Sequence, residues 1–304
     1  MKTVLGKTIL IMAVIAICLL FIVVACLCQY QSQLIFPGQG KGGDSRADLE
    51  RLSRQPAVNE QAIPVTLASG LKTWVRIVAA GDRLPDATAN DHYLVLFFYG
   101  NCGRLDWFGE FAAPFLNCNL DFACIEWPGF GVAEGRPSER NCYEAADSLW
   151  RVAQERFGYR PEHVIIAGYS MGVGLACELA TRYSAGGLIL FSGFTSMPDI
   201  AQYHFPYLPV RWFLTTHFDN RDKLSKISSP CLLLHGTADT IVPFRMAEEN
   251  EQSARTGGCD VTLHALPEGD HEVFDEPVVD LLHTPLTEFV NKIRARNELE
   301  EQLP

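Results

Sequence analysis

Gly168-Tyr169-Ser170-Met171-Gly172 lies between an apolar run and a run with helical spacing, and this stretch decides the fold. The preceding residues 163–167 are mostly apolar and β-branched, which predicts a buried strand, whereas residues 173–183 predict a helix. Gly-x-Ser-x-Gly between strand and helix is the pattern of a nucleophile elbow. A Cβ at either glycine of this strained turn would collide with the neighbouring strand or helix. We therefore expect the Ser170 hydroxyl to be exposed at a helix N-terminus, where the helix dipole favours developing negative charge. The alternative is a chance match to a common pattern.

Composition restricts the class of protein. The chain has 304 residues, of which 48% are hydrophobic and 20% charged, so it is globular rather than disordered. A net charge of −11 and the lack of a basic stripe argue against nucleic acid as a partner. Its eight histidines form no His-Glu-x-x-His motif and its cysteines no paired Cys-x-x-Cys motif, so we expect neither a metal nor another cofactor.

The N-terminal region predicts attachment to a membrane. Residues 8–28 carry no charge over 21 positions, which is long enough for a transmembrane helix and favours a retained signal anchor. Lys2 and Lys7 precede this run, so we expect the N-terminus in the cytoplasm and the rest of the chain outside it. An alternative is a lipoprotein, because Val23-Val24-Ala25-Cys26 resembles a bacterial lipobox that would leave Cys26 as a lipidated N-terminus.

The remaining chain predicts one α/β domain. We divide the sequence into an anchor at 1–30, a polar tether at 31–60 that is ordered only in part, and a folded domain at 61–304. Strands that alternate with helices predict a mostly parallel sheet with helices on both faces. The expected strands are 63–67 and 71–78, which form an edge hairpin, and 93–99, 122–126, 188–191, 231–234 and 261–266; the expected helices are 105–116, 139–157, 246–254 and 278–294.

An acid and a histidine follow Ser170 in the order that a nucleophilic serine requires. A serine hydroxyl needs a base to take its proton and a third group to orient that base. Asp239 comes just after the strand at 231–234, and His271 just after the strand at 261–266. Parallel strands end at one sheet edge, so we expect Ser170, His271 and Asp239 to form a catalytic triad.

Each of these positions has a competing interpretation. Asp239 could be a helix N-cap, and His271 a solvent-facing loop residue. Asp270 and Glu268 are the nearest competitors for the acid, but they share the loop of the histidine. His235, at the end of a strand, is expected to be structural.

Two backbone N–H groups are expected to bind the oxyanion of the tetrahedral intermediate. The first is that of Met171, directly after the nucleophile. The second comes from the loop Gly100-Asn101-Cys102-Gly103, where we favour Asn101 and place Cys102 second.

With these residues the chain resembles the α/β-hydrolase superfamily, and within it the membrane-anchored serine-aminopeptidase-like branch that includes lipid and acyl-protein hydrolases. The resemblance begins after the anchor at Gln31-Ser32-Gln33-Leu34-Ile35-Phe36-Pro37 and includes the three triad positions. Tyr99-Gly100-Asn101-Cys102-Gly103 matches the branch's His-Gly-Asn-Ala-Gly, with tyrosine in place of histidine. Glu126-Trp127-Pro128-Gly129-Phe130-Gly131 resembles its Asp-Tyr-Arg-Gly-Tyr-Gly, from which Trp127 and Pro128 depart. The resemblance implies an α/β-hydrolase fold with a short helical cap.

The expected cap is the segment 195–229, which is rich in aromatic residues. These side chains are expected to line an apolar acyl or aromatic pocket, although packing of the cap onto the body explains half of them equally well. A cap this short leaves the site open, which favours a scissile ester, thioester or amide at the end of a larger molecule.

The cysteines leave one specific expectation. In an oxidising compartment, Cys102 and Cys142 are the pair expected to form a disulfide, because both lie in or near loops at the active-site edge. Cys124, Cys177 and Cys231 lie in apolar contexts and are expected in the core.

The sequence therefore predicts a membrane-tethered serine hydrolase that acts on an acyl ester, thioester or amide. Within enzymes, the alternative is an aminopeptidase-type amidase with the same triad. The alternative of another class is an inactive membrane-bound scaffold that uses the cap as a docking surface.

Overall fold

A computed structural model describes residues 2–40, 45–55, 57–83, 85 and 92–302 of the chain. Its strands form one eight-stranded sheet in the order β1-β2-β4-β3-β5-β6-β7-β8. Strand β2 is antiparallel to β1 and to β4, and the other neighbours are parallel, as predicted. The strands are β1 (Glu60–Thr66), β2 (Lys72–Val78), β3 (Leu94–Phe98), β4 (Asp121–Ile125), β5 (Val164–Tyr169), β6 (Gly187–Phe191), β7 (Cys231–Gly236) and β8 (Val261–Leu266).

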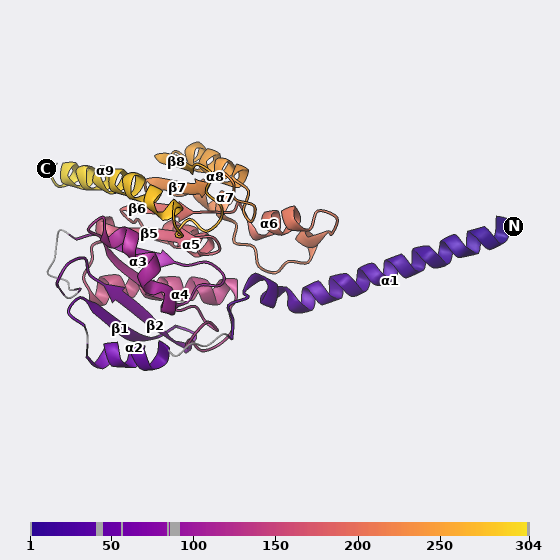
Figure 1. Cartoon of the computed structure of the whole chain (residues 1–304), viewed down its shortest axis with the longest axis horizontal. Helices are drawn as coiled ribbons and strands as arrows, with labels where there is room; N and C mark the ends of the chain where they lie inside the picture. Colours follow the sequence, from indigo (N-terminus) through magenta and orange to yellow (C-terminus); the bar gives the residue numbers. More distant parts are fainter. Residues whose placement is uncertain (1, 41–44, 56, 84, 86–91, 303–304) are drawn as a thin grey trace.

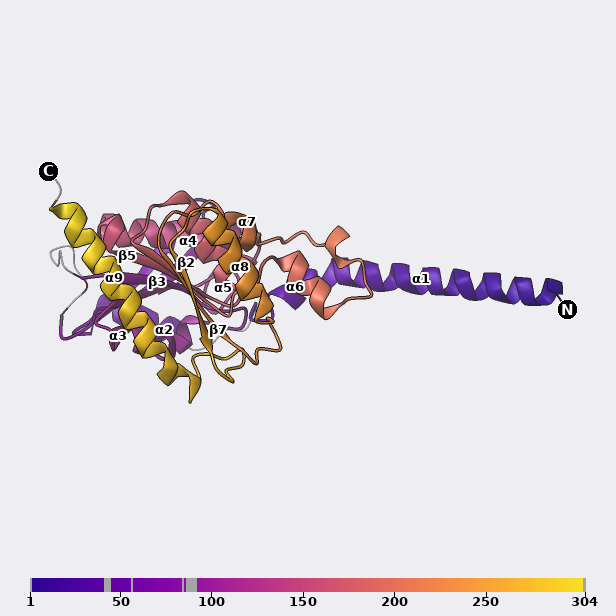
Figure 2. The ribbon, with the colours of Figure 1, turned by 90° about the horizontal axis from the view of Figure 1, so that it is seen from above.

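Helices cover both faces of this sheet (Figure 1, Figure 2). They are α1 (Lys2–Ile35), α2 (Ser45–Arg54), α3 (Phe108–Leu116), α4 (Glu139–Arg151), α5 (Gly172–Arg182), α6 (Met197–His204), α7 (Asn220–Leu224), α8 (Arg245–Thr256) and α9 (His283–Glu301). Helices α4, α5, α7 and α8 contact one another in succession and form one layer. On the other face, the Cys118 thiol after α3 lies 3.5 Å from the Thr287 hydroxyl of α9. The predicted α/β-hydrolase architecture is confirmed.

The core explains why the central strands are almost wholly apolar. Every residue of β3, β4, β5, β6 and β7 is buried, as expected for strands covered by helices on both faces. At the centre, the Phe97 ring of β3 packs against rings from α3, β4 and β6, namely Phe111, Phe115, Phe122 and Phe191. This packing fixes the strand ends from which the functional loops leave.

Helix α1 projects away from the domain, and the N-terminus lies at its far end (Figure 1, Figure 2). Its stretch Gly6–Ile35 has a mean hydropathy of 3.4 in its most apolar window, none of which is buried within the structure. In length and composition α1 is therefore able to cross a membrane. The helix continues past the predicted end of the anchor, to Ile35.

The predicted tether at 31–60 is more ordered than expected. Phe36 is buried after the end of α1, and Leu49 and Leu52 of α2 are buried where this helix packs on β1. The apolar spacing of these leucines, three apart on one helix face, accounts for the packing. Residues 41–44 and 56 of the tether lie outside the described residues.

The cap is shorter than predicted. It comprises α6 and a 3₁₀ turn at Val210–Trp212, which project from the domain on the side of α1 (Figure 1). Helix α7, in the last third of the predicted insert, belongs instead to the layer with α5 and α8. The reason is burial, because Asn220 and Leu224 are fully enclosed and the Asn220 amide donates to the Phe194 carbonyl at 3.0 Å.

The predicted disulfide between Cys102 and Cys142 is wrong, because both cysteines are free. Cys102 is exposed in its loop, whereas Cys142 lies on the buried face of α4 beside Ala145 and Ala146. Burial also raises the pKa of the Cys142 thiol to about 12. The amphipathic pattern of α4 directs this side chain into the core rather than towards the loop.

Candidate active site

The turn at Ser170 has the strained geometry that its glycines predict. Ser170 has φ = 53°, in the left-handed region that non-glycine residues seldom adopt. A Cβ at Gly168 would lie 2.6 Å from the Gly172 carbonyl oxygen, and one at Gly172 would overlap the Phe98 carbonyl. The sharp turn from the strand into α5 therefore requires glycine at both positions.

The structure brings Ser170, His271 and Asp239 together. The Ser170 Oγ lies 2.9 Å from His271 Nε2, and His271 Nδ1 lies 2.9 Å from Asp239 Oδ2. An ionised carboxylate only accepts hydrogen bonds, so the imidazole Nδ1 donates to Asp239. The Nε2 lone pair then faces the Ser170 hydroxyl and accepts its hydrogen bond.

Asp239 is held in the ionised form by its surroundings. Burial alone would raise the pKa of this carboxyl group. Hydrogen bonds from His235 and His271, together with the backbone N–H of Val242 at 2.8 Å, outweigh burial and hold the pKa below its ordinary value. The N–H of Ile241 donates to the same oxygen at 2.9 Å. All four donors point at one carboxylate, which therefore remains charged opposite the imidazole.

His235 does more than the structural role expected of it. Its Nε2 lies 2.7 Å from the Val242 carbonyl oxygen and 3.2 Å from Asp239 Oδ2, and its side chain is almost fully buried. Because a carbonyl only accepts, Nε2 carries the proton and donates to both oxygens. The position four residues before Asp239 is the one sequence feature that could have indicated this contact.

Hydrogen bonds to the backbone carbonyl of His271 hold its loop in place. The Ser192 hydroxyl donates to the His271 carbonyl at 3.1 Å. The Tyr169 hydroxyl, which donates to the Glu272 carboxylate at 2.6 Å, lies 3.2 Å from the same carbonyl. Asp270 and Glu268, the competing acids, are exposed. The Asp270 carboxylate accepts the Glu272 N–H of its own loop at 3.1 Å.

Asn101 and Met171 line the same pocket as Ser170. Met171 is at the N-terminus of α5, and Asn101 lies in the tight turn closed by the Gly103 N–H on the Gly100 carbonyl at 3.0 Å. The Asn101 carbonyl accepts the Gly38 N–H at 3.1 Å. The segment that follows α1 thus orients the peptide groups of this loop.

A pocket of about 510 Å³ opens above Ser170, and three parts of the chain enclose it. The body contributes residues around the serine, and the cap contributes apolar side chains such as Ile200 and Leu208. The third wall comes from α1, through Val24, Leu27, Cys28, Gln31, Leu34 and Ile35. No sequence pattern indicates this wall, and it makes the site less open than the short cap suggested.

Only part of the aromatic set of the cap faces the pocket. His204, Phe205 and Phe213 line it, as expected. Phe218 is instead fully buried and packs edge-on against Phe36, in the body of the domain.

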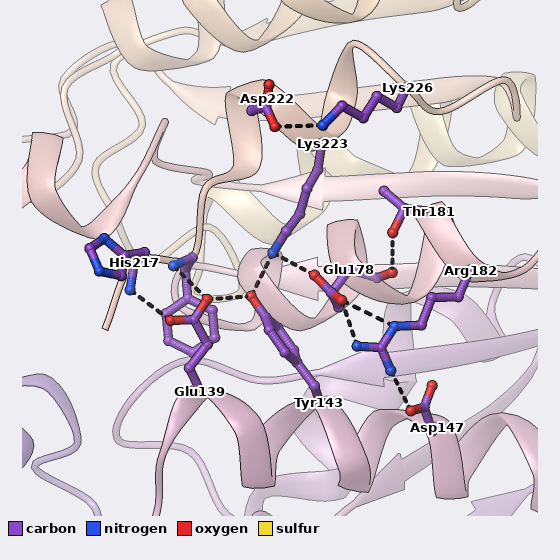
Figure 3. Close-up of polar contacts among 11 residues, drawn as sticks. Glu139, Tyr143, Asp147, Glu178, Thr181, Arg182, His217, Asp222, Lys223 and Lys226 are labelled. Atoms are coloured by element: carbon purple, nitrogen blue, oxygen red, sulfur yellow. Dashed lines mark hydrogen bonds and ion pairs between the residues drawn. The ribbon is translucent and has the colours of Figure 1, made fainter. Parts of the chain in front are cut away.

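The end of the cap is held to the body by the Glu139 carboxylate (Figure 3). It accepts the backbone N–H of His217 at 2.7 Å and that of Phe218 at 3.0 Å. The Tyr143 hydroxyl also donates to it, and Lys223 links Tyr143 to Glu178 of α5 (Figure 3). This network joins α4, α5 and α7 to the base of the cap.

A mostly parallel sheet, a strained serine turn, and an acid and a histidine on two later loops define an α/β hydrolase. The chain shares the α/β-hydrolase fold, and residues 93–216 match the family model described as alpha/beta hydrolase fold. It is 38% identical over 158 residues to alpha/beta hydrolase domain-containing protein 17B of Xenopus tropicalis, across 51% of this chain and 53% of that protein. The chain spans about half the length of the curated relatives it matches.

Solved structures share the fold at low identity. An alpha-beta hydrolase from Vibrio vulnificus superimposes with a TM-score of 0.69 at 18% identity, over 87% of this chain and 93% of that one. An esterase from Pyrococcus furiosus gives a TM-score of 0.64 at 13% identity, over 84% of this chain and 96% of that one. These similarities establish the fold of the whole domain.

Proposed function

We propose that this protein is a membrane-tethered serine hydrolase that cleaves an acyl ester or thioester. The observation that carries the proposal is the chain of two 2.9 Å contacts from Ser170 through His271 to Asp239. Ser170 attacks the acyl carbonyl carbon while His271 takes the hydroxyl proton. The same proton then passes from His271 to the leaving group, and water hydrolyses the acyl-enzyme in a second, equivalent step.

The other residues of the site have roles that follow from their position. Asp239 holds the imidazole tautomer and stabilises its positive charge. The backbone N–H groups of Met171 and Asn101 bind the oxyanion. Serine chemistry of this kind requires no metal and no other cofactor.

The pocket favours an acyl group over an aminoacyl group. Among the described residues, its lining includes no Asp or Glu that could bind a substrate ammonium group. Its lining side chains are mostly aliphatic and aromatic, which suits an acyl chain. We therefore prefer an esterase or thioesterase to an aminopeptidase-type amidase.

Labelling by a fluorophosphonate probe tests the proposal against an inactive scaffold. Wild-type protein is expected to react covalently, and Ser170→Ala to lose the label while it keeps the same unfolding temperature. Turnover should fall by roughly 10⁴-fold or more, as for other single triad deletions. Labelling of Ser170→Ala at wild-type stoichiometry would contradict the assignment of the nucleophile.

We also propose that residues 8–28 hold the protein in the membrane with the hydrolase domain outside the cytoplasm. Lys2 and Lys7 on the N-terminal side support this orientation. Protease added outside sealed cells is expected to digest the domain and to spare an N-terminal tag. Complete protection of the domain would show the reverse orientation.

A further inference from the structure

Helix α1 contributes one continuous face to the pocket of Ser170. Val24, Leu27 and Gln31 are partly buried, whereas Ala25 and Cys26 between them are exposed. Spacings of three and four place the first three side chains on one helix face, and all three line the pocket. The contact of α1 with the rest of the protein is therefore directional.

Hydrogen bonds fix this wall in place. The Gln31 side-chain carbonyl accepts the N–H and the hydroxyl of Thr215, at 3.0 Å each, and its amide donates to the Phe213 carbonyl at 3.5 Å. These contacts join α1 to the end of the cap. A few residues on, the Gly38 N–H holds the Asn101 carbonyl. The anchor helix is thus connected to both the cap and the loop next to Ser170.

The wall begins at the depth of the bilayer. An α-helix rises about 1.5 Å per residue, so the uncharged run 8–28 spans about 32 Å, close to the roughly 30 Å hydrocarbon core. Val24 and Leu27 lie in the last turns of this run, and Gln31 lies just beyond it. One side of the pocket therefore continues from the level of the lipid tails to the level of water.

The cap carries exposed aromatic residues of the type that favour a membrane surface. The cap extends from the domain on the same side as α1 (Figure 1, Figure 2). On it, Tyr207 is 97% exposed and Trp212 83% exposed. Tyrosine and tryptophan are enriched at the level of lipid headgroups. With α1 in a bilayer, the cap is placed to rest on that same surface.

We infer, on the basis of the proposed function, that the substrate is a lipid ester whose acyl chain passes from the bilayer along α1 into the pocket of Ser170. Val24 and Leu27 then contact the chain directly, and the anchor is part of the substrate site as well as a tether. The acyl chain moves from the apolar interior of the bilayer to an apolar pocket without passing through water. This route avoids the free-energy cost of exposing the acyl chain to water.

Selectivity for acyl length tests the wall. Full-length protein is reconstituted in phosphatidylcholine vesicles, and the rates on hexadecanoyl and butanoyl p-nitrophenyl esters are compared as a ratio. Leu27→Trp fills the pocket from α1 and is expected to lower the ratio by about tenfold or more. Ala25→Trp adds the same ring at nearly the same depth on an exposed face that does not line the pocket, and it is expected to leave the ratio unchanged.

An unchanged ratio in Leu27→Trp, or an equal change in both variants, would overturn the inference. If Leu27→Trp is inactive on both esters, Leu27→Ala is measured instead. The smaller side chain widens the pocket at α1, so this variant must also change the ratio. Wild-type protein that neither reacts with the fluorophosphonate probe nor hydrolyses any ester would contradict the proposed function itself. Active wild-type protein with a ratio insensitive to Leu27 contradicts only the role of α1.

The route from the bilayer has its own measurement. A long-chain glycerolipid ester is supplied either in the vesicles that hold the protein or in separate, protein-free vesicles. Hydrolysis is expected mainly when the ester shares the bilayer of the protein. Equal rates in both arrangements would show that the substrate arrives through water, and would overturn the route along α1.

Discussion

The Tyr99 hydroxyl donates a hydrogen bond to the buried carboxylate of Glu126, next to the loop that carries Asn101. The Leu105 N–H donates to the other oxygen of the same carboxylate at 3.4 Å. One side chain therefore holds both ends of the loop that we propose to form the oxyanion hole. The Tyr99 hydroxyl in turn accepts the backbone N–H of Trp127 at 3.0 Å, so this hydroxyl both donates and accepts.

Tyr99→Phe is expected to lower kcat about tenfold with little change in KM. The variant keeps the ring but removes the donor to Glu126, and it leaves the backbone N–H of Trp127 without its acceptor. Complete loss of one oxyanion donor costs roughly 10²- to 10³-fold in kcat, and displacement of the loop costs part of this. Steady-state rates on a short-chain ester measure it. An unchanged kcat would show that the Tyr99–Glu126 contact does not position the loop.

Glu126→Gln is expected to remove a pH dependence of stability. Burial raises the pKa of Glu126 from 4.5 to about 7. Between these values the folded protein keeps a proton that the unfolded chain has lost. The resulting stabilisation is complete below about pH 4.5 and is lost as the pH rises to about 7, for a total of roughly 3 kcal/mol.

Urea unfolding of both proteins at several pH values measures this effect. The free energy of unfolding of wild type, relative to Glu126→Gln, should fall as the pH rises through this range. Glu155→Gln, the same change at an exposed position, serves as the control and should follow wild type. Parallel curves for wild type and Glu126→Gln would contradict the raised pKa.

The sequence is sufficient to predict the fold and to identify Ser170, His271 and Asp239 as three residues that lie together. Both follow from local rules, since buried strands are apolar throughout and functional loops leave at strand ends. The wall made by α1 is different in kind. Helix α1 is apolar on every side over this run, so nothing in its pattern distinguishes Leu27 from Ala25.

Two other differences have physical causes outside the local pattern. The segment of α7 is polar enough to be taken for part of the cap, but Asn220 finds a buried partner in the Phe194 carbonyl. Tyr99 stands where the serine-aminopeptidase-like branch, which this chain resembles, usually has histidine. The structure shows its partner, Glu126, which stands where that branch has aspartate; the two positions are 27 residues apart in sequence.

His235→Phe is expected to lower kcat/KM about tenfold, which corresponds to one hydrogen bond of roughly 1.4 kcal/mol. The variant keeps an aromatic ring but cannot donate to Asp239 or to the Val242 carbonyl. His235→Gln retains a donor and should recover part of the loss. Ester hydrolysis by the three proteins measures the effect. Equal activity of the Phe and Gln variants would show that His235 acts by packing alone.

His235→Phe is also expected to change how the stability of the protein depends on pH in acid. The depressed pKa of Asp239 contributes stability that is present above about pH 4 and is lost as the pH falls towards the lower folded value. Without the His235 donor this contribution is smaller. The stability difference between wild type and His235→Phe should therefore shrink below about pH 4. A difference independent of pH would mean that His235 does not stabilise the Asp239 charge.

Glu139→Ala is expected to loosen the cap. It removes the acceptor of the His217 and Phe218 N–H groups, so KM for a long-chain ester should rise about tenfold, the equivalent of one such bond. Limited proteolysis should also cut the cap faster. Glu110→Ala, at an exposed position of α3, is the matched control. Unchanged KM and proteolysis in Glu139→Ala would show that the network of Figure 3 does not hold the cap.

Native thiol labelling is expected to distinguish Cys102 from Cys142. The thiolate is the reactive form, and Cys142 is buried with a pKa raised to about 12, whereas Cys102 is exposed. Iodoacetamide should therefore modify Cys102 in the folded protein and reach Cys142 only after unfolding. Because Cys102 adjoins Asn101, the added group should also slow ester hydrolysis, and Cys102→Ser should protect against this loss. Peptide mapping of non-reduced protein from an oxidising compartment completes the test. A Cys102–Cys142 disulfide, or equal native labelling of both residues, would contradict the buried position of Cys142.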